Sequence, residues 1–578
     1  METKGLTRRN FMTGALAAAG AVGAMGLAGC SPSSQSTATT QAATTDTSNT
    51  SLHTWETAPK PITDFADELE ADVVIIGAGM AGCTAAQAAA EAGASVIVVE
   101  QFSGITAHGE DIGGIGTKLQ TENGIEVDKD EAARLIYQWS QQLANWNLIR
   151  VFTERSGEVL DYYIDMARDQ GIEINLDNRM TARSDWGDLE ERFRQFRTAH
   201  KFGPLQESQR EDGQWQSATF IDMCKDDAES NGATFMFDTK AEQLIKDGDA
   251  VTGVVVSDGD GYKKIVANNG VIIATGGIGN NQEMIECWCP LALRADTNSY
   301  TPEGGESGDG ILMGMWAGAA PGKSTPAPMV HPVNLAPMGP GFDTTWLTVD
   351  RNGQRYCCEM GYEPIVTNAR MNTPGNVAFA IMDADYKEHA IKQEPVKSAS
   401  FVDGLEEAVE AAVKEGTYYK GETLDDLAKE IDVPADALKA SIDRYNQWCD
   451  TGVDKDFGVP ERFLSPIKNG PFYACKVNAW LLALPYGLHV DQNSQVCTAD
   501  DKPIEGLFAI GNAQGDFFGE LLPRHLPRHK PWPLRYLRSS RGPSTCHRHH
   551  HRRLQHRPRL IPPINPSYMR RWSVERSI

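Results

Sequence analysis

The sequence predicts an α/β fold in which a glycine-punctuated domain is interrupted by a second domain of mixed helices and strands. Three observations lead to this prediction. Residues 72–100 read as strand, helix and strand. Two later apolar runs, within 268–281 and 503–515, each lead into glycine, and residues 397–450 between them have the apolar spacing of helices. The 578 residues are enough for two or more domains of ordinary size.

The composition narrows the class of protein. Apolar residues make up 41% and charged residues 23% of the chain, so it can bury sizeable cores and is not a polytopic membrane protein. The net charge of −24 argues against nucleic acid as a partner of most of the surface. Residues 521–578 differ from the rest, because they hold 14 of the 54 basic residues but only one of the 78 acidic ones. No metal site is predicted, because the 11 cysteines form no CxxC pair.

Residues 1–30 carry the features of an export signal. Arg8 and Arg9 precede a weakly apolar run of Gly and Ala that is too short to span a bilayer comfortably. The arginine pair resembles the twin-arginine export motif, and the Leu-Ala-Gly-Cys sequence ending at Cys30 resembles a bacterial lipoprotein cleavage box. We therefore expect export through the twin-arginine translocon, lipidation of Cys30 and anchoring on the outer face of the cytoplasmic membrane. Residues 31–63 have the Ser- and Thr-rich composition of a solvated linker.

The strand, helix and strand at 72–100 contain a complete dinucleotide-binding fingerprint. Gly77 permits a tight turn, Gly79 lets the backbone approach a pyrophosphate, and Gly82 lets the helix pack closely on the strand. The helix N-terminus adds unpaired N–H groups and a partial positive charge. Glu100 ends the second strand, where a carboxylate accepts the ribose hydroxyls and disfavours a 2′-phosphate, so the ligand is FAD or NAD.

Three later segments decide between these two cofactors. Residues 268–281 contain Ala-Thr-Gly-Gly, residues 304–322 contain Gly-Asp-Gly, and residues 503–515 contain Gly-Asn. In this order they resemble the FAD-dependent oxidoreductases of the fumarate reductase and succinate dehydrogenase flavoprotein family, over about residues 72–520. The resemblance implies FAD as the cofactor. The residues expected at FAD are Gly77, Gly79, Met80, Ala81, Gly82, Glu100, Gln101, Gly113, Gly114, Ala274, Thr275, Gly276, Gly277, Gly308, Asp309, Gly310, Gly511 and Asn512.

The resemblance also implies an architecture. Such proteins have a discontinuous Rossmann-like FAD-binding domain with three layers, interrupted by an α+β clamp domain that closes over the flavin. In this chain the FAD-binding domain is expected at residues 64–326 and 485–520, and the clamp at residues 327–484. Closure of the clamp would exclude water from a reactive hydride.

The chemistry implied by the resemblance is hydride transfer from reduced flavin to an activated C=C bond of a small organic acceptor, with a protein acid supplying the proton. The electrons would come from a separate donor protein, either a cytochrome or a quinol-linked protein. His331 and Pro332 match the His-Pro pair at the start of the family's clamp, so His331 is a candidate catalytic residue facing the substrate. The alternative is a solvated histidine in a Pro-rich loop.

Two departures from the family pattern argue against fumarate as the substrate. Glu363 stands where fumarate reductases place a proton-donating arginine, and Ala483 stands in the region where they place a carboxylate-binding histidine. An acid at the first position would repel a dicarboxylate, so a less charged acceptor is expected. Tyr362 or Tyr486 could supply the acid and the oxyanion donor, although either could equally be a packing residue, and Arg370 is a further candidate donor.

A second enzyme class shares part of this pattern. The strings NGPFYA and GLFAIGN also resemble 3-ketosteroid dehydrogenases of the same superfamily, and Tyr473 stands where those enzymes place a catalytic tyrosine. We interpret Tyr473 as structural, because PFYA also occurs in relatives of fumarate reductase. A steroid-type dehydrogenase therefore remains the alternative activity.

The C-terminal tail at 521–578 departs from the family pattern altogether. The family continues with a Gly-rich loop and a helix whose N-terminus points at the flavin. Nine prolines exclude a long helix here, and seven histidines with 13 arginines cannot be buried, so the tail is expected to be disordered. It could be a basic arm for anionic lipid or nucleic acid, a metal-binding histidine cluster, or an out-of-frame translation. We favour the third interpretation, because the composition changes at one residue inside a motif.

An out-of-frame tail has a functional consequence. The element that should close the flavin site would be missing, so FAD binding would be weakened. The alternative to an enzyme is then an exported lipoprotein that keeps the fold but has lost the flavin and catalysis.

Overall fold

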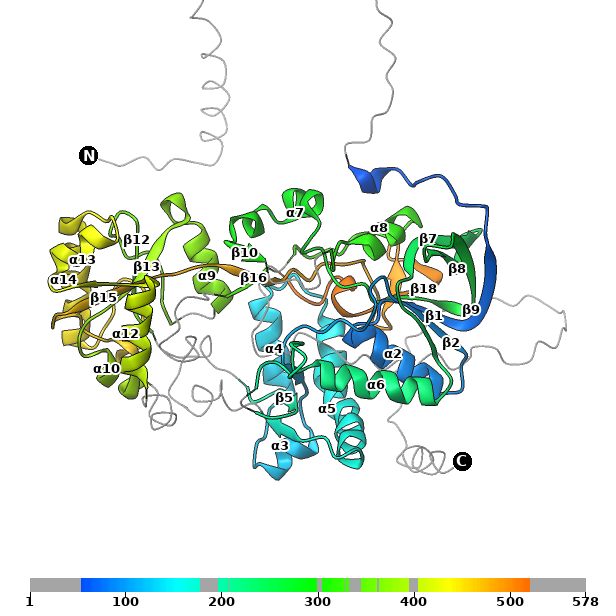
Figure 1. The fold of residues 1–578 in the computed structure, drawn as a ribbon, viewed down its shortest axis with the longest axis horizontal. Helices are drawn as coiled ribbons and strands as arrows, with labels where there is room; N and C mark the ends of the chain where they lie inside the picture. The colour runs from blue at the N-terminus through cyan, green and yellow to red at the C-terminus, as the bar shows by residue number, and fades with distance from the viewer. Residues whose placement is uncertain are drawn as a thin grey trace, which may run out of the picture. The chain divides into compact units, whose positions relative to one another are not determined.

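The fold is given by a computed structural model of the chain (Figure 1). The described residues are 53–176, 196–205, 207–298, 304–326, 328–331, 345–360, 363–393 and 404–519. The predicted signal at 1–30 with Cys30, the linker up to residue 52, Tyr362 and the tail at 521–578 lie outside the described residues. None of the described helices combines the length and the apolar character that crossing a membrane requires.

An eight-stranded mixed sheet forms the centre of what we call the large lobe, residues 53–331 and 478–519. Its strand order is β17-β18-β9-β1-β2-β6, and β7 and β8 extend from β9 as an antiparallel hairpin. β2, β1, β9 and β18 are parallel neighbours, so their carboxyl ends lie in this order along one edge. The strands are β1 (Asp67–Ile76), β2 (Val96–Val99), β6 (Thr234–Met236), β7 (Lys240–Asp247), β8 (Ala250–Ser257), β9 (Tyr262–Ile273), β17 (Gln495–Cys497) and β18 (Pro503–Ala509).

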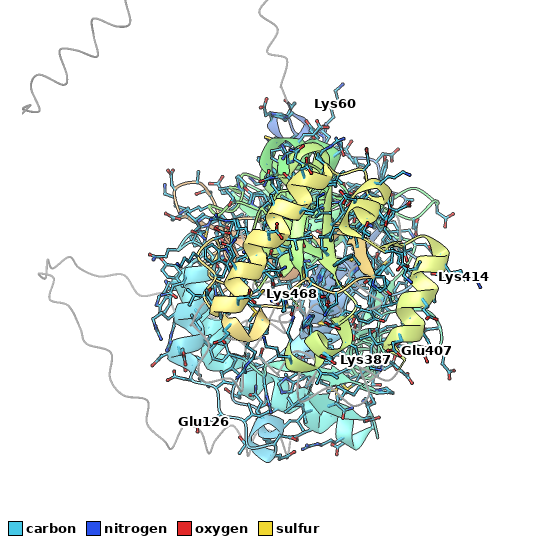
Figure 2. The ribbon with its side chains drawn as sticks, turned by 90° about the vertical axis from the view of Figure 1, so that its left-hand side faces the viewer. Lys60, Glu126, Lys387, Glu407, Lys414 and Lys468 are labelled. Atoms are coloured by element: carbon cyan, nitrogen blue, oxygen red, sulfur yellow. The ribbon has the colours of Figure 1, made fainter. Side chains whose placement is uncertain are left out.

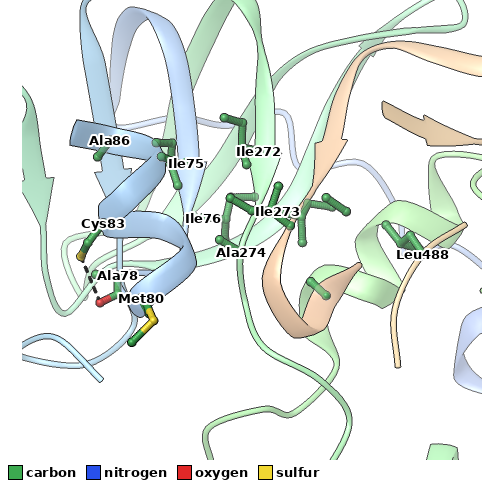
Figure 3. Close-up of a cluster of buried hydrophobic side chains, with 14 of the residues drawn as sticks. Ile75, Ile76, Ala78, Met80, Cys83, Ala86, Ile272, Ile273, Ala274 and Leu488 are labelled. Carbon is green, nitrogen blue, oxygen red and sulfur yellow. Dashed lines mark hydrogen bonds between the residues drawn. The ribbon is translucent and has the colours of Figure 1, made fainter. Parts of the chain in front are cut away.

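The core of this sheet comes from continuous apolar runs. Ile75 pairs with Ile272 and Ile76 with Ile273 across β1 and β9, and all four side chains are buried (Figure 3). α2 (Met80–Glu91) and α6 (Ala218–Ser230) pack together on one side of the parallel strands, and the β7–β8 hairpin lies on the other (Figure 1). This mixed α/β arrangement confirms the predicted fold class.

The first helix packs unusually close to the turn that precedes it. α2 begins directly after Gly79. A Cβ atom on Gly82 would lie 1.8 Å from Gly77 O, so only glycine allows this approach. One turn along, the Cys83 thiol donates to Ala78 O at 3.4 Å (Figure 3). The three-glycine spacing therefore builds the packing that the fingerprint predicts.

The rest of the large lobe surrounds this sheet. β3, β5 and β4 form a small antiparallel sheet beside the helices α3 to α5. The remaining elements are β3 (Asp111–Gly113), α3 (Lys118–Glu122), α4 (Lys129–Trp139), α5 (Trp146–Asp169), β4 (Ile174–Leu176), β5 (Ala199–Phe202), α7 (Gln282–Trp288), η3 (Pro290–Arg294), α8 (Asp309–Trp316) and η7 (Gly511–Ala513).

The first described residues are fastened to the large lobe. Glu283 at the start of α7 accepts hydrogen bonds from Thr54 N at 3.1 Å and from Thr54 Oγ1 at 2.6 Å. Trp55, in η1 (Thr54–Glu56), packs on Trp288 with ring centroids 4.7 Å apart. Trp316 Nε1 donates to Thr54 O at 3.2 Å. We call these contacts the N-terminal latch.

A third sheet lies where the predicted clamp begins and ends. It consists of β10 (Thr297–Asn298), β16 (Trp480–Ala483) and β11 (Met329–His331) in the order β10-β16-β11. Val330 and Leu481 pair across β11 and β16, and both belong to the core of the large lobe. These two strands, which fall inside the predicted 327–484, thus share a core with the large lobe.

Residues 345–477 form an insertion lobe with apolar clusters of its own. The sheet order is β12-β13-β15-β14, all antiparallel, and separate apolar clusters pack on it. The elements are β12 (Leu347–Asp350), α9 (Glu363–Met371), η5 (Pro374–Asn376), β13 (Ala378–Met382), α10 (Tyr386–Gln393), α12 (Leu405–Glu415), β14 (Tyr418–Gly421), α13 (Leu424–Glu430), α14 (Ala435–Thr451), η6 (Glu461–Phe463) and β15 (Phe472–Lys476). The helices predicted between 397 and 450 are present as α12, α13 and α14.

Charged residues of the insertion lobe divide between its surface and one buried group. Figure 2 shows Lys387 on α10 and Lys414 on α12 at the surface. In the interior, Arg355 Nε donates to Glu359 Oε1 at 2.8 Å and Arg355 Nη2 to Asp454 Oδ2 at 2.9 Å. Glu359 is therefore a structural residue of this lobe.

Candidate functional site

The carboxyl ends of four neighbouring strands meet at one pocket of the large lobe. The pocket is a partly open hollow whose empty space, open solvent included, is about 970 Å³. Residues that follow β2, β1, β9 and β18 line it, together with the start of α8. The predicted residues in its lining are Gly77, Gly79, Met80, Ala81, Glu100, Gln101, Ala274, Thr275, Gly276, Asp309, Gly511 and Asn512.

The N-terminus of α2 opens into this pocket. The first main-chain hydrogen bond of the helix runs from Cys83 N to Gly79 O at 2.9 Å, and no side chain caps Gly79. The N–H groups of Met80 and Ala81 are thus those that a helix start leaves for an anion. A Cβ atom on Gly79 would meet nothing closer than Thr106 Oγ1 at 3.5 Å, so the space beside it belongs to the pocket.

Glu100 is held in a fixed orientation at the end of β2. Its Oε2 accepts from Ala78 N at 2.7 Å and its Oε1 from Phe102 N at 3.1 Å, and the residue is 6% exposed. Burial raises the pKa of this carboxyl group, and the two main-chain donors oppose the increase. A carboxylate anchored in this way can accept hydrogen bonds from two neighbouring hydroxyls of a ligand.

On the side of the α2 N-terminus opposite Glu100, one buried polar group lacks a hydrogen-bond partner among the described residues. Thr275 Oγ1 is buried in the lining and makes no hydrogen bond to a described residue. Buried hydroxyls are almost always hydrogen-bonded, so this one indicates a ligand. Nearby, Asn512 Nδ2 donates to Glu306 Oε1 at 3.1 Å and joins two lining segments.

A family comparison decides which ligand this pocket is built for. A sequence model described as the FAD binding domain matches residues 72–520. The chain belongs to the FAD-binding domain family. Its cofactor is FAD, and the residues above fit it: Glu100 would hold the adenosine ribose, the N–H groups of Met80 and Ala81 the pyrophosphate, and Thr275 a group beyond.

Other comparisons agree with this assignment. The flavoprotein is 26% identical to a vinyl phenol reductase of Lactiplantibacillus plantarum over 484 residues, which cover 78% of this chain and 92% of that protein. It is 27% identical to a probable fumarate reductase of Shewanella frigidimarina, covering 77% of this chain and 70% of that protein. Its fold matches a 3-ketosteroid-Δ4-(5α)-dehydrogenase of Rhodococcus jostii with a TM-score of 0.64 at 22% identity, covering 81% and 95%. The flavoprotein is an FAD-dependent oxidoreductase that acts on C=C bonds of small organic acceptors.

Six predicted flavin contacts lie outside the pocket lining, and most of them serve packing. Gly82 packs on the turn at Gly77, as its place in the fingerprint predicts. The other five lie close to protein atoms in this conformation, and their contact with the flavin stays a prediction. A Cβ atom added to Gly114 would lie 2.7 Å from Leu160 Cδ2, and one added to Gly277 would lie 2.4 Å from Leu484 O. A Cβ atom added to Gly308 would lie 2.7 Å from Met284 Sδ, and one added to Gly310 would lie 2.3 Å from Thr275 Oγ1. Gly113, in β3, pairs with Ala199 of β5.

Two of the predicted catalytic residues, Tyr486 and Arg370, form hydrogen bonds that hold the fold together. Tyr486 donates from its hydroxyl to Gly322 O at 3.0 Å and packs on Trp288, and burial raises its pKa to about 12. Arg370 is fully buried and donates to Val477 O, Asn376 Oδ1 and Asp296 Oδ2. These bonds give both residues a structural role, and the donor role predicted for either stays a prediction.

The remaining candidates divide differently. His331 is buried at the end of β11, opposite Trp480 of β16, so it is not a solvated loop residue. Tyr362 lies outside the described residues. Tyr473 packs against Tyr386 within the insertion lobe, with ring centroids 5.6 Å apart, which favours its structural interpretation.

Several lining residues were missed by the sequence reasoning. They are Phe102, Thr106, Thr239, Lys240, Ser307, Glu306 and Met313. Glu306 and Ser307 directly precede the predicted Gly-Asp-Gly run, so the motif could have been extended by two residues. Thr239 and Lys240 carry no such signal. They follow β6, which pairs with β2, and Thr239 N donates to Glu100 O at 2.8 Å.

Proposed function

We propose that this flavoprotein reduces the activated C=C bond of a small organic acceptor other than fumarate, with electrons from a separate cytochrome or quinol-linked donor protein. Reduced FAD supplies the hydride in such a reaction. The chain itself must hold the cofactor, seat the acceptor, exclude water and deliver one proton. The observation that carries the proposal is the convergence of four strand ends on one pocket within the family match.

The acceptor side is argued from charge. Fumarate carries two carboxylates, whose binding needs cationic partners in a closed site. Position 363 is a glutamate, position 483 is an alanine, and the Arg370 guanidinium is held by Asp296 and two further acceptors. A carboxylate of the substrate and a nearby carboxylate of the protein would repel each other by on the order of several kcal/mol, which is the Coulomb energy of two like charges in a medium of low dielectric constant. The vinyl phenol reductase among the relatives supports an acceptor with fewer charges.

The first thirty residues support a proposal for the cellular location of this flavoprotein. The arginine pair at Arg8 and Arg9 and the box ending at Cys30 support export by the twin-arginine route and lipid anchoring on the outer face of the cytoplasmic membrane. Export of a folded, FAD-loaded protein is what this route provides. Labelling of the protein in cells with radioactive palmitate, and its loss in Cys30→Ala, tests the anchor.

The activity is tested with purified full-length protein supplied with FAD. Anaerobic reduction with dithionite should bleach the flavin, and an uncharged or monoanionic enone or enoate should restore the oxidised spectrum with one saturated product per flavin. Fumarate should not restore it. Faster reoxidation by fumarate would contradict the proposal, and a folded protein that takes up no FAD would support the non-catalytic lipoprotein instead.

A further inference from the structure

Glu306, which lines the cofactor pocket, has a backbone conformation that few side chains adopt. It lies in the segment that leads into α8, and its φ of 52° is in the left-handed region. In that region the β-carbon is crowded by the residue's own main chain, so the conformation is costly for a glutamate. Strained residues of this kind are concentrated at functional sites.

Two neighbouring asparagines hold this conformation in place. Asn280 donates from Nδ2 to Gly305 O at 2.6 Å and from its main-chain N to Glu306 O at 3.2 Å. Asn281 Nδ2 donates to Ser307 O at 2.8 Å. Three consecutive carbonyl groups thus receive hydrogen bonds from one short segment. A strained residue persists only where its surroundings fix it in this way, so the position of Glu306 is set by the protein itself.

The Glu306 side chain reaches the ends of β9 and β18. Asn512, which follows β18, donates from Nδ2 to Glu306 Oε1 at 3.1 Å. A Cβ atom on Gly276, which follows β9, would lie 2.6 Å from Glu306 Cγ, so this glycine leaves room for the glutamate. Both partners line the pocket as well. Because β1 lies between β9 and β2, the carboxylate is on the side of the pocket away from Glu100.

The order of the strands indicates which part of FAD reaches this carboxylate. Glu100 after β2 would hold the adenosine ribose, and the start of α2 after β1 would hold the pyrophosphate. The ends of β9 and β18 come next along the same edge. In FAD the ribityl chain follows the pyrophosphate, and it carries hydroxyl groups but no charge. A carboxylate is a strong acceptor for hydroxyl groups, whereas it would repel a phosphate.

We propose that Glu306 is a positioning residue for the flavin, and that its carboxylate accepts a hydrogen bond from a hydroxyl group of the ribityl chain. The fixed turn and the bond from Asn512 hold the acceptor in place, so binding requires little ordering of the protein. A ribityl chain held at this point determines how far the isoalloxazine ring extends beyond β18. This role concerns the cofactor and is independent of the acceptor that the flavin reduces.

Cofactor analogues combined with variants of the protein test this role. The full-length apoprotein is titrated with FAD and with FAD analogues that each lack one hydroxyl group of the ribityl chain, the 2′-, 3′- and 4′-deoxy forms, and flavin fluorescence gives each Kd. Glu306→Gly removes the carboxylate, and Glu306→Asn, which also tolerates the left-handed conformation, repeats the test should the first variant fail to fold. Gln142→Gly is the control, since Gln142 has a similar φ of 60° in an exposed turn outside the pocket lining.

For the wild type and for Gln142→Gly, the Kd for at least one deoxy analogue should exceed the Kd for FAD by about tenfold, the effect of losing one hydrogen bond to a charged group. In Glu306→Gly the same ratio should fall to within about twofold of unity, because the missing hydroxyl has lost its partner. A merely structural glutamate would weaken FAD and the analogues alike and leave the ratio unchanged. An unchanged ratio, or analogues that all bind as FAD does, would overturn the inference and leave the proposed function standing. A wild type that binds no FAD would overturn both.

Discussion

Arg370 Nη2 donates to Asp296 Oδ2 at a distance of 2.5 Å, and this pair joins the two lobes. Asp296 lies just before β10 of the large lobe, and its Oδ2 also accepts from Ala479 N at 2.7 Å. Arg370 lies on α9 of the insertion lobe, and its Nε donates to Val477 O at 2.6 Å, next to the point where the chain returns to the large lobe. One buried guanidinium therefore fixes the connection on which any closure of the insertion lobe depends.

Removing this guanidinium should destabilise the protein. Arg370→Met leaves Val477 O and Asn376 Oδ1 without their donor and is expected to lower the free energy of unfolding by about 3 kcal/mol, a typical cost of breaking a buried pair. Arg370→Lys keeps the charge but not the planar fork, so its effect should be intermediate. Urea denaturation of the holoprotein measures both. Arg155→Met, which removes an exposed pair with Glu158, is the control, and an equal effect of the control would refute the bracing role.

Two glycines of the fingerprint should respond differently to alanine. Gly79→Ala adds a Cβ atom that meets only Thr106 at 3.5 Å, so the protein should fold while its Kd for FAD rises by at least about tenfold, or ~1.4 kcal/mol. Gly82→Ala places its Cβ atom 1.8 Å from Gly77 O and should destabilise the fold itself. Gly104→Ala, with open space around the added atom, is the matched control. Titration of the apoprotein with FAD and thermal unfolding separate the two effects, and unchanged FAD affinity in Gly79→Ala would exclude a close pyrophosphate.

A buried histidine should make stability depend on pH. His489 Nε2 lies 2.7 Å from Asp501 Oδ1, and its Nδ1 is hydrogen-bonded to Asp516. The bond with Asp516 raises the pKa of His489, while burial and the nearby Lys323 ammonium oppose the increase. The folded-state pKa thus lies above the unfolded value of about 6.5. The stabilisation is complete below that value and is lost as pH rises through the folded-state pKa.

A variant that lacks the His489 imidazole tests this dependence of stability on pH. The unfolding free energy of the wild type should fall between about pH 6 and about pH 9, and the fall should be smaller in His489→Asn, which cannot take up the proton. Urea denaturation at the two pH values gives the comparison. Identical pH profiles of the two proteins would show that another group is responsible.

The tail at 521–578 should be dispensable for the cofactor. Among the described residues, the pocket lining runs from Ile76 to Asn512. A stop codon after Glu520 is therefore expected to leave the Kd for FAD unchanged within about twofold, well below the tenfold that 1.4 kcal/mol would produce. A functional basic arm would instead give the full-length chain a salt-dependent affinity for anionic vesicles or nucleic acid that the truncated chain lacks. Loss of FAD on truncation would contradict the out-of-frame interpretation.

The part of the site that sequence could predict is the part built by neighbours along the chain. Gly77, Gly79 and Glu100 belong to one βαβ unit, whose spacing alone places them at the same strand edge. Gly277 and Gly310 follow equally clear glycine patterns, yet they pack on Leu484 and Thr275, which are distant in sequence. Glycine supplies both close approach to a ligand and close approach to protein, and the pattern does not tell them apart.

The lobe connection lay beyond prediction for a similar reason. Arg370 was a candidate donor because it was a nearby downstream arginine, but its partners Asp296 and Val477 are 74 and 107 residues away. At the ends of the predicted insertion, Val330 of β11 and Leu481 of β16 lie in the core of the large lobe. Apolar residues in a short strand do not reveal which of two cores will bury them.

The N-terminal latch limits the length of the linker that would separate a lipid-anchored enzyme from its membrane. Because Thr54 and Trp55 are bound to Glu283 and Trp288, the segment between a lipid at Cys30 and the latch consists of residues 31–52. The full extension of 22 residues is about 75 Å. That length exceeds the roughly 8 Å over which physiological salt screens charge, so the acidic body would lie beyond the repulsion of anionic headgroups. A soluble redox partner could then approach it from any side.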